Sequence, residues 1–214
     1  MTLLQFVEGP MWYFAATVFL VGAAWRVIGL LAIGRKTDLS PAKHSAAVGF
    51  IKGNLRHFVP RTTFAERTWF HWLAGYAFHL GLFALLFFAA PHVKFIEQRI
   101  LGFGWPAMSR TWFIIAAEIA FAGLIVLWVR RIADPVMRQI SDRDDHMGSW
   151  LTFLVMLTGC FALGESDPGL RTLHMGLVNL WLIYFPFSRL MHAFTFALSR
   201  GYTGAIYGRR GVTP

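Results

Sequence analysis

The sequence predicts an all-α integral membrane protein, a bundle of five transmembrane helices with its N-terminus outside and its C-terminus in the cytoplasm. The first observation is composition: 56% of the 214 residues are hydrophobic and only 14% are charged, whereas soluble domains carry about a quarter charged residues. The second is five apolar stretches long enough to approach or cross a hydrocarbon core of about 30 Å. The third is an uneven distribution of Lys and Arg between them.

The first two spans are the longest. The first, 10–34, reads "PMWYFAATVFLVGAAWRVIGLLAIG" and is interrupted by one charge, Arg26. The second, 68–92, reads "TWFHWLAGYAFHLGLFALLFFAAPH", with Pro91 near its end. Both have the length of a spanning helix.

Three further spans follow. The third, 108–129, contains one carboxylate, Glu118. The fourth, 149–166, closes on the polar run "GES", so it is short or ends in a turn. The fifth, 172–198, lies in "LRTLHMGLVNLWLIYFPFSRLMHAFTFAL" and is apolar apart from a few polar side chains.

The basic residues orient this bundle. Fourteen Lys and Arg residues fall on the side of the C-terminus and four on the side of the N-terminus, which predicts a cytoplasmic C-terminus. The net charge of +9 therefore reflects membrane topology and does not indicate nucleic-acid binding. The basic segment "DLSPAKHSAAVGFIKGNLRHFVPR" between the first two spans is either held to anionic lipid or a docking surface for a cytoplasmic partner.

Histidines in apolar spans are the main functional signal, because ionisable groups inside a membrane are expensive. Taken singly, each is more often a hydrogen-bonded core residue. His174 and His192, however, are 18 residues apart, which is five turns of an ideal helix. That spacing predicts a common helix face and a separation of about 27 Å along the axis.

The second span offers partners for these two histidines. His79 lies deep inside it and His92 lies at its outer end. Imidazole is an axial ligand of haem iron, so two such helices would hold two stacked haems. The two residues differ by about 220° around an ideal helix, so a shared face requires a bend, which Pro91 would provide. His71 is a rival to His79 as the inner ligand.

Four other polar residues have two readings each. Arg26 and Arg189 either snorkel to the headgroups or pair with haem propionates. Glu118 is either a proton acceptor near a quinol or a hydrogen-bonded residue of the bundle. Lys94, two residues beyond His92, is either an interfacial anchor or, with His92, part of a quinone-binding site.

The single cysteine, Cys160, excludes an intrachain disulfide, an iron–sulfur cluster bound by this chain alone and a c-type haem attachment.

Several of these motifs resemble one known family. "FPFSRLMH" before His192, the spacing of His174 and His192, "FHLGL" around His79 and "VFLVGAAWR" in the first span are similar to segments of the gamma subunit of respiratory nitrate reductases, a membrane di-haem cytochrome b. The resemblance covers about residues 10–200. In that family the fourth ligand lies ten residues after the "FHLGL" histidine, where this chain has Ala89, and His92 is the nearest substitute.

The resemblance implies a single membrane-embedded cytochrome b domain over 1–214 in a prokaryotic cytoplasmic membrane, multi-pass and in contact with lipid. It implies an electron-transfer, quinol-oxidising subunit of an oxidoreductase complex. One or two haem b groups would be held by His79 and His192 and by His174 with His92. The partners implied are quinone, a cytoplasmic iron–sulfur subunit and a molybdenum or heterodisulfide-reductase-like catalytic subunit. A haem-free membrane anchor or a proton-relay or transport protein is the alternative.

Overall fold

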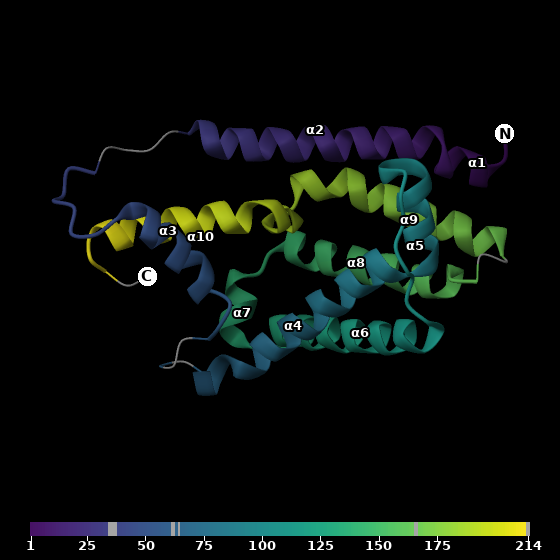
Figure 1. Ribbon diagram of the computed structural model, residues 1–214. Coiled ribbons are helices and arrows are strands. Elements are labelled where there is room, and N and C mark those ends of the chain that lie inside the picture. The colour runs from purple at the N-terminus through teal and green to yellow at the C-terminus, as the bar shows by residue number, and fades with distance from the viewer. Residues whose placement is uncertain (34–37, 61–62, 64, 165–166, 213–214) are drawn as a thin grey trace. The chain divides into compact units, whose positions relative to one another are not determined.

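A computed structural model describes residues 1–33, 38–60, 63, 65–164 and 167–212. Within those ranges all regular secondary structure is helical, with no strand (Figure 1). The helices are α1 (Leu3–Glu8), α2 (Pro10–Ala32), α3 (Ala46–Arg56), α4 (Ala65–Phe88), α5 (Ala90–Ile96), α6 (Arg110–Ala133), α7 (Pro135–Ile140), α8 (Arg143–Ala162), α9 (Pro168–Tyr184) and α10 (His192–Arg209). A π-helical turn, η2 (Glu97–Leu101), follows α5, and two 3-10 turns, η3 (Phe185–Phe187) and η4 (Arg189–Met191), separate α9 from α10.

The chain forms two compact units. The first comprises Met1–Thr17 and Phe70–Tyr184, and the second comprises Val18–Trp69 and Phe185–Pro214. The prediction of a single domain over 1–214 stays a prediction.

Helices α4, α6 and α8 build the core of the first unit. Its buried members include Leu85, Phe113, Leu124 and Met156. Small residues let α4 and α6 approach closely: a methyl group added to Gly81 would lie 2.8 Å from the Ala120 Cβ. Small residues are typical of interfaces between membrane helices, where close van der Waals contact stabilises the pair.

Three helical segments are long and apolar enough to cross a membrane, namely Leu3–Ala32, Ala65–Phe88 and Arg110–Ala133. They coincide with the first three predicted spans, and the first joins α1 to α2. Thus an all-α membrane protein is confirmed, whereas the count of five spans and the orientation stay predictions. Gly34 of the first predicted span, and 165–166 of the fourth, lie outside the described residues.

The second predicted span is interrupted. Helix α4 ends at Phe88, Ala89 adopts an extended conformation, and α5 begins with Pro91 in its first turn. A proline suits the first turn of a helix because it has no N–H to leave unpaired. The bend that Pro91 was expected to provide is therefore present, and it separates His79 from His92.

The prediction of one helix over 172–198 is wrong. Helix α9 ends at Tyr184, and the two 3-10 turns occupy Phe185–Met191 before α10 begins at His192. Pro186, which is buried, cannot donate the hydrogen bond that a continuing helix requires. The inference that His174 and His192 share one face of a single helix therefore fails.

The second unit contains an antiparallel pair of helices, α3 and α10. Gly49 and Gly53 of α3 face Gly204 and Gly208 of α10: a methyl group added to Gly53 would lie 2.8 Å from the Gly204 Cα, and one added to Gly208 would lie 2.7 Å from the Gly49 Cα. Each helix carries a Gly-x3-Gly pattern at the contact. The backbones therefore touch directly, as in closely packed membrane helices.

Candidate functional site

The break between α4 and α5 positions His92. The Nδ1–H group of His92 donates a hydrogen bond to the Leu85 carbonyl oxygen, 2.9 Å away and seven residues earlier. A carbonyl oxygen only accepts, so the proton of the neutral ring is on Nδ1 and the lone pair is on Nε2. A backbone bond of this kind fixes the orientation and tautomer of metal-binding histidines.

Helix α8 positions His174, which lies on α9. The Thr158 hydroxyl donates to the Leu154 carbonyl oxygen (2.8 Å), so its oxygen is left to accept from His174 Nδ1–H (3.2 Å). Gly159 provides the space for the ring, because a methyl group there would lie 3.0 Å from the His174 Cε1. His174 therefore also carries its lone pair on Nε2.

These two arrangements bring His92 and His174 together. Their ring centroids are 6.2 Å apart and their planes are 20° from parallel. A metal–imidazole bond is about 2 Å long, so two imidazoles on opposite sides of one metal ion have centroids about 6 Å apart. The two rings are therefore close enough to be candidate ligands of one haem, and Gly159 is the kind of small residue that leaves room beside a ligand ring.

Helices α1 and α9 are tied together along the part of α9 that carries His174. Arg171 forms an ion pair with Glu8, and the buried Asn179 donates from Nδ2 to the Val7 carbonyl oxygen (2.8 Å). Sequence reasoning missed α1 and both contacts. The Thr2 and Gln5 capping box that starts α1 was the available signal.

In His79 and His192, as in His92, the Nδ1–H group is bonded to a backbone carbonyl oxygen. His79 Nδ1–H donates to the Gly75 carbonyl oxygen (2.7 Å), and His192 Nδ1–H donates to the Arg189 carbonyl oxygen (2.8 Å). His79 belongs to the first unit and His192 to the second. Their pairing as ligands of one haem stays a prediction.

The bond between Nδ1 and a backbone carbonyl is not sufficient to mark a ligand. His57, at the end of α3, donates to the Gly53 carbonyl oxygen in the same way (2.6 Å). Among the described residues, the buried Nδ1 of His71 has no hydrogen-bond partner, and the choice between His71 and His79 stays open.

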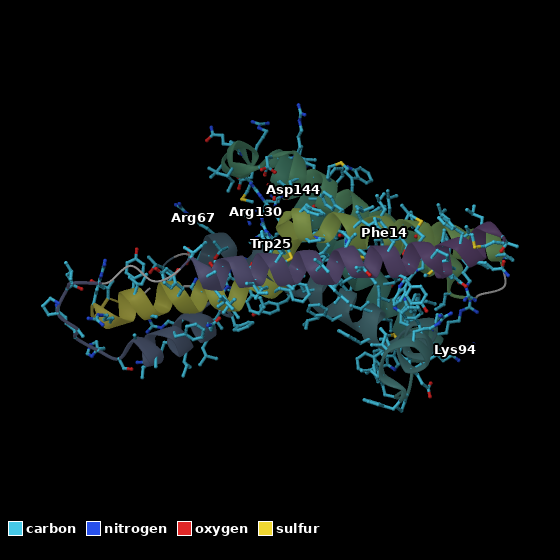
Figure 2. All side chains as sticks on the ribbon, turned by 90° about the horizontal axis from the view of Figure 1, so that it is seen from above. Phe14, Trp25, Arg67, Lys94, Arg130 and Asp144 are labelled. Carbon is cyan, nitrogen blue, oxygen red and sulfur yellow. The ribbon has the colours of Figure 1, made fainter. Side chains whose placement is uncertain are left out.

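The remaining predicted site residues lie at exposed positions. Arg26 lies on α2 and Arg189 in the turn before α10, both in the second unit and both exposed. Lys94 is exposed on α5, two residues beyond His92, and Figure 2 labels it there. Glu118 is exposed on α6 beside apolar residues such as Ile115 and Ile119.

An apolar recess of about 550 Å³ lies beside the α4–α5 break. It is lined by Phe87, Phe88, Trp105 and Pro106. The Trp105 indole N–H donates to the Phe87 carbonyl oxygen (2.7 Å), and the Met108 N–H donates to the Phe88 carbonyl oxygen (2.8 Å). These bonds hold the segment before α6 against the end of α4.

A haem iron can be held by two histidines, so pairs of histidines are the feature to look for in this chain. Within the described ranges no group of three or more His, Cys, Asp or Glu side chains is placed to hold a metal ion. A bis-histidine haem needs only two protein ligands, since the porphyrin supplies the other four donor atoms.

Membrane-spanning helices combined with opposed histidines are features of membrane cytochromes b. The chain is 30% identical over 218 residues to a protein of Nitratidesulfovibrio vulgaris, with 97% of this chain and 96% of the relative covered. The chain belongs to the family of that protein, whose name, "Protein", states no activity.

A second, more distant relative carries a descriptive name. The chain is 27% identical over 201 residues to the "Hdr-like menaquinol oxidoreductase cytochrome b-like subunit" of Archaeoglobus fulgidus, with 75% of this chain and 59% of the relative covered. This likeness supports a membrane cytochrome b-like family. No protein-family profile and no solved structure matches the chain.

Proposed function

We propose that this chain is the cytochrome b subunit of a membrane oxidoreductase and transfers electrons from menaquinol to a cytoplasmic partner. The observation that carries the proposal is the pair of opposed rings of His92 and His174, 6.2 Å apart. The name of the archaeal relative, a subunit of an "Hdr-like menaquinol oxidoreductase", supports menaquinol as the donor. The resemblance to nitrate reductase gamma subunits supports the same role at the membrane.

The proposal includes five spans, with the N-terminus outside. Helices α8 and α9 would be the fourth and fifth, and their ends at Ala162 and Pro168 lie on the outer side together with His92 and His174. His79 and His192 would form the second ligand pair, near the cytoplasmic side. Arg26 and Arg189 would pair with propionates there.

Haem b, when bound, supplies a reversible one-electron carrier. The contribution of the chain is to hold the ligand rings in place. The bonds to Leu85 and Thr158 fix the tautomers of His92 and His174 with the lone pair on Nε2, and through these atoms the two rings would hold the haem.

The quinol would bind beside the α4–α5 break. The recess lined by Phe87, Phe88 and Trp105 is apolar enough for a quinone ring, and Lys94 follows His92 by two residues on α5. The Lys94 ammonium group would donate a hydrogen bond to a quinol oxygen. Oxidation of quinol to quinone releases two electrons and two protons; the electrons pass inward through the chain and the protons leave on the outer side, which makes the reaction electrogenic.

Addition of a reduced menaquinone analogue to the purified complex tests this proposal. We expect the absorption bands of the reduced b-type cytochrome to appear after the quinol analogue is mixed with the complex. Reduction of the partner subunit should follow. Lys94→Ala should raise the KM for quinol and leave the haem content unchanged. Absence of b-type bands in the purified protein would instead favour a haem-free anchor or proton-relay protein.

A further inference from the structure

Three apolar side chains of helix α3 are exposed on the surface of the second unit. Val48, Ile51 and Leu55 are 48%, 58% and 64% exposed, and their spacing of three and four residues puts them on one helix face. The opposite face carries Gly49 and Gly53, which contact the backbone of α10. A helix on the surface of a soluble protein has the reverse arrangement, with large apolar residues facing the protein core.

The exposed apolar face of α3 indicates that lipid surrounds this side of the helix. Small residues at the helix–helix contact and large apolar residues facing outward are typical of helices surrounded by lipid. With 11 residues, α3 is about 16 Å long and too short to cross the hydrocarbon core. An apolar face on a helix of this length is typical of a helix that lies at the membrane surface.

The charges around this face have one sign. Lys52 and Arg56 lie on one flank of the apolar face and are exposed, and residues 39–65 contain no Asp or Glu. The paired helix α10 also lacks carboxylates and carries Arg200 and Arg209. Each Lys or Arg near an anionic membrane surface contributes about 1 kcal/mol of attraction.

Helix α10 follows α9, the proposed fifth span, in the chain after the turns at Phe185–Met191. The contacts of α3 fall on Arg200, Gly204 and Gly208 of α10. Helix α3 therefore packs against a helix that follows the proposed fifth span on its C-terminal side, which is the proposed cytoplasmic side.

We propose that α3 is an interfacial helix whose face of Val48, Ile51 and Leu55 inserts into the cytoplasmic leaflet, where Lys52 and Arg56 bind the phosphates of anionic phospholipids. The inference is independent of haem binding, but its assignment to the cytoplasmic leaflet rests on the orientation given under the proposed function. A soluble partner subunit seated on the same face is the competing occupant.

Site-specific fluorescence on the full-length chain tests the proposal. Single cysteines are introduced at Ile51 and Leu55 in a Cys160→Ser background and labelled with an environment-sensitive fluorophore. The matched control is Ala46→Cys, an exposed residue of the same helix on its glycine side. The protein is reconstituted into vesicles of phosphatidylcholine with or without phosphatidylglycerol.

We expect quenching of the Ile51 and Leu55 labels by nitroxide-bearing lipid and little quenching of the Ala46 label. Phosphatidylglycerol should strengthen the quenching at Ile51, and the double variant K52E/R56E should remove that dependence on lipid charge. Equal quenching of all three labels by aqueous iodide, with none by lipid nitroxide, would overturn the proposal. Protection from both quenchers only after addition of a soluble partner subunit would also overturn it and assign the face to that partner.

Discussion

The two proposed ligand pairs differ in what holds their members. His92 and His174 lie in one compact unit, with ring centroids 6.2 Å apart and hydrogen bonds from both rings to neighbouring atoms. His79 and His192 lie in different units, and each ring is bonded within its own helix or turn. The first pair is therefore arranged by the fold of one unit, whereas the pairing of His79 with His192 stays a prediction.

This comparison teaches that breaks between helices position two of the four candidate ligands, whereas His79 and His174 lie inside α4 and α9. The extended residue Ala89 and the following Pro91 place His92, and the turns at Phe185–Met191 place His192. The expected consequence is a preformed site at His92 and His174 and a site at His79 and His192 that orders when haem binds.

The largest effect is expected from removal of a ring of the preformed pair. His92→Ala or His174→Ala should abolish haem binding at that site, because a haem iron left with one protein ligand loses the bis-histidine coordination that holds it. Haem per chain, measured as pyridine haemochrome, checks this expectation.

His57→Ala is the matched control, because His57 makes the same bond from Nδ1 to a backbone carbonyl and lies outside the predicted spans. Its haem content should equal that of the unaltered protein. An unchanged haem content in His92→Ala would remove His92 from the ligand set and return His71 to consideration.

The next effect concerns the residue that orients His174. Thr158→Val removes the acceptor for His174 Nδ1–H while keeping a similar volume. Loss of such a supporting bond typically costs 10–100-fold in metal affinity, so haem should dissociate from this site at roughly 10-fold lower concentrations of a competing haem-binding protein. Thr195→Val removes a hydroxyl that donates to the Met191 carbonyl oxygen and should leave haem affinity at the His174 site unchanged. An equal loss in both variants would contradict the assigned role.

A smaller effect is expected in the packing that supports the preformed pair. A methyl group at Gly123 would lie 2.5 Å from the Phe78 backbone nitrogen and 2.7 Å from the Ala74 carbonyl oxygen. Gly123→Ala should therefore force α4 and α6 apart and lower the free energy of unfolding by about 1–3 kcal/mol.

Gly75→Ala is the control on α4, because among the described residues no atom outside its own helical turns lies within 4 Å of the added methyl group. Alanine is favoured over glycine in a helix interior by roughly 0.5–1 kcal/mol, so this variant should be as stable as the parent or slightly more stable. Thermal unfolding followed by circular dichroism in detergent compares the stability of the two variants. A destabilised Gly75→Ala with an unaffected Gly123→Ala would refute the close packing of α4 against α6 at Gly123.

The smallest effect is a pH-dependent contact in the second unit. Hydrogen bonds from Ser40, and next the interaction with Arg210, hold the pKa of Asp38 well below its ordinary value of 3.8. The carboxylate therefore contributes stability above about pH 4, which is lost as the pH falls through the lower pKa of the folded state.

Ser40→Ala and Arg210→Ala should each raise the pKa of Asp38, because each removes one side-chain hydrogen bond to the carboxylate. Carboxyl ¹³C NMR titration, with Asp38→Asn to assign the signal, measures both shifts. An unchanged pKa in Ser40→Ala would show that the hydroxyl of the local turn does not control this carboxyl.

Much of the helical framework could be predicted from the sequence, because long apolar runs leave few alternatives to helix inside a membrane. The starts of α6 and α8 follow the capping residues Ser109 and Asp142. The break at Pro91 was also predictable, whereas the break at Phe185–Met191 was missed even though Pro186 signalled it. An apolar run carries no periodic signal that distinguishes a bent helix from a straight one.

The contacts that fix the candidate site were less accessible from the sequence. The bond from His174 to Thr158 joins residues on neighbouring helices, and a single sequence does not specify which helices are neighbours. The pairing of α3 with α10 was missed as well, although the repeated Gly-x3-Gly spacing in both segments was its signal. Local patterns therefore identified the candidate residues, and tertiary packing decided which of them meet.

The most direct test of the central claim is a reduced-minus-oxidised absorption spectrum of the purified chain, with haem counted against protein. The account predicts b-type bands and two haems per chain, one of which is lost in His92→Ala and in His174→Ala alike. A purified, folded chain without b-type bands would contradict it.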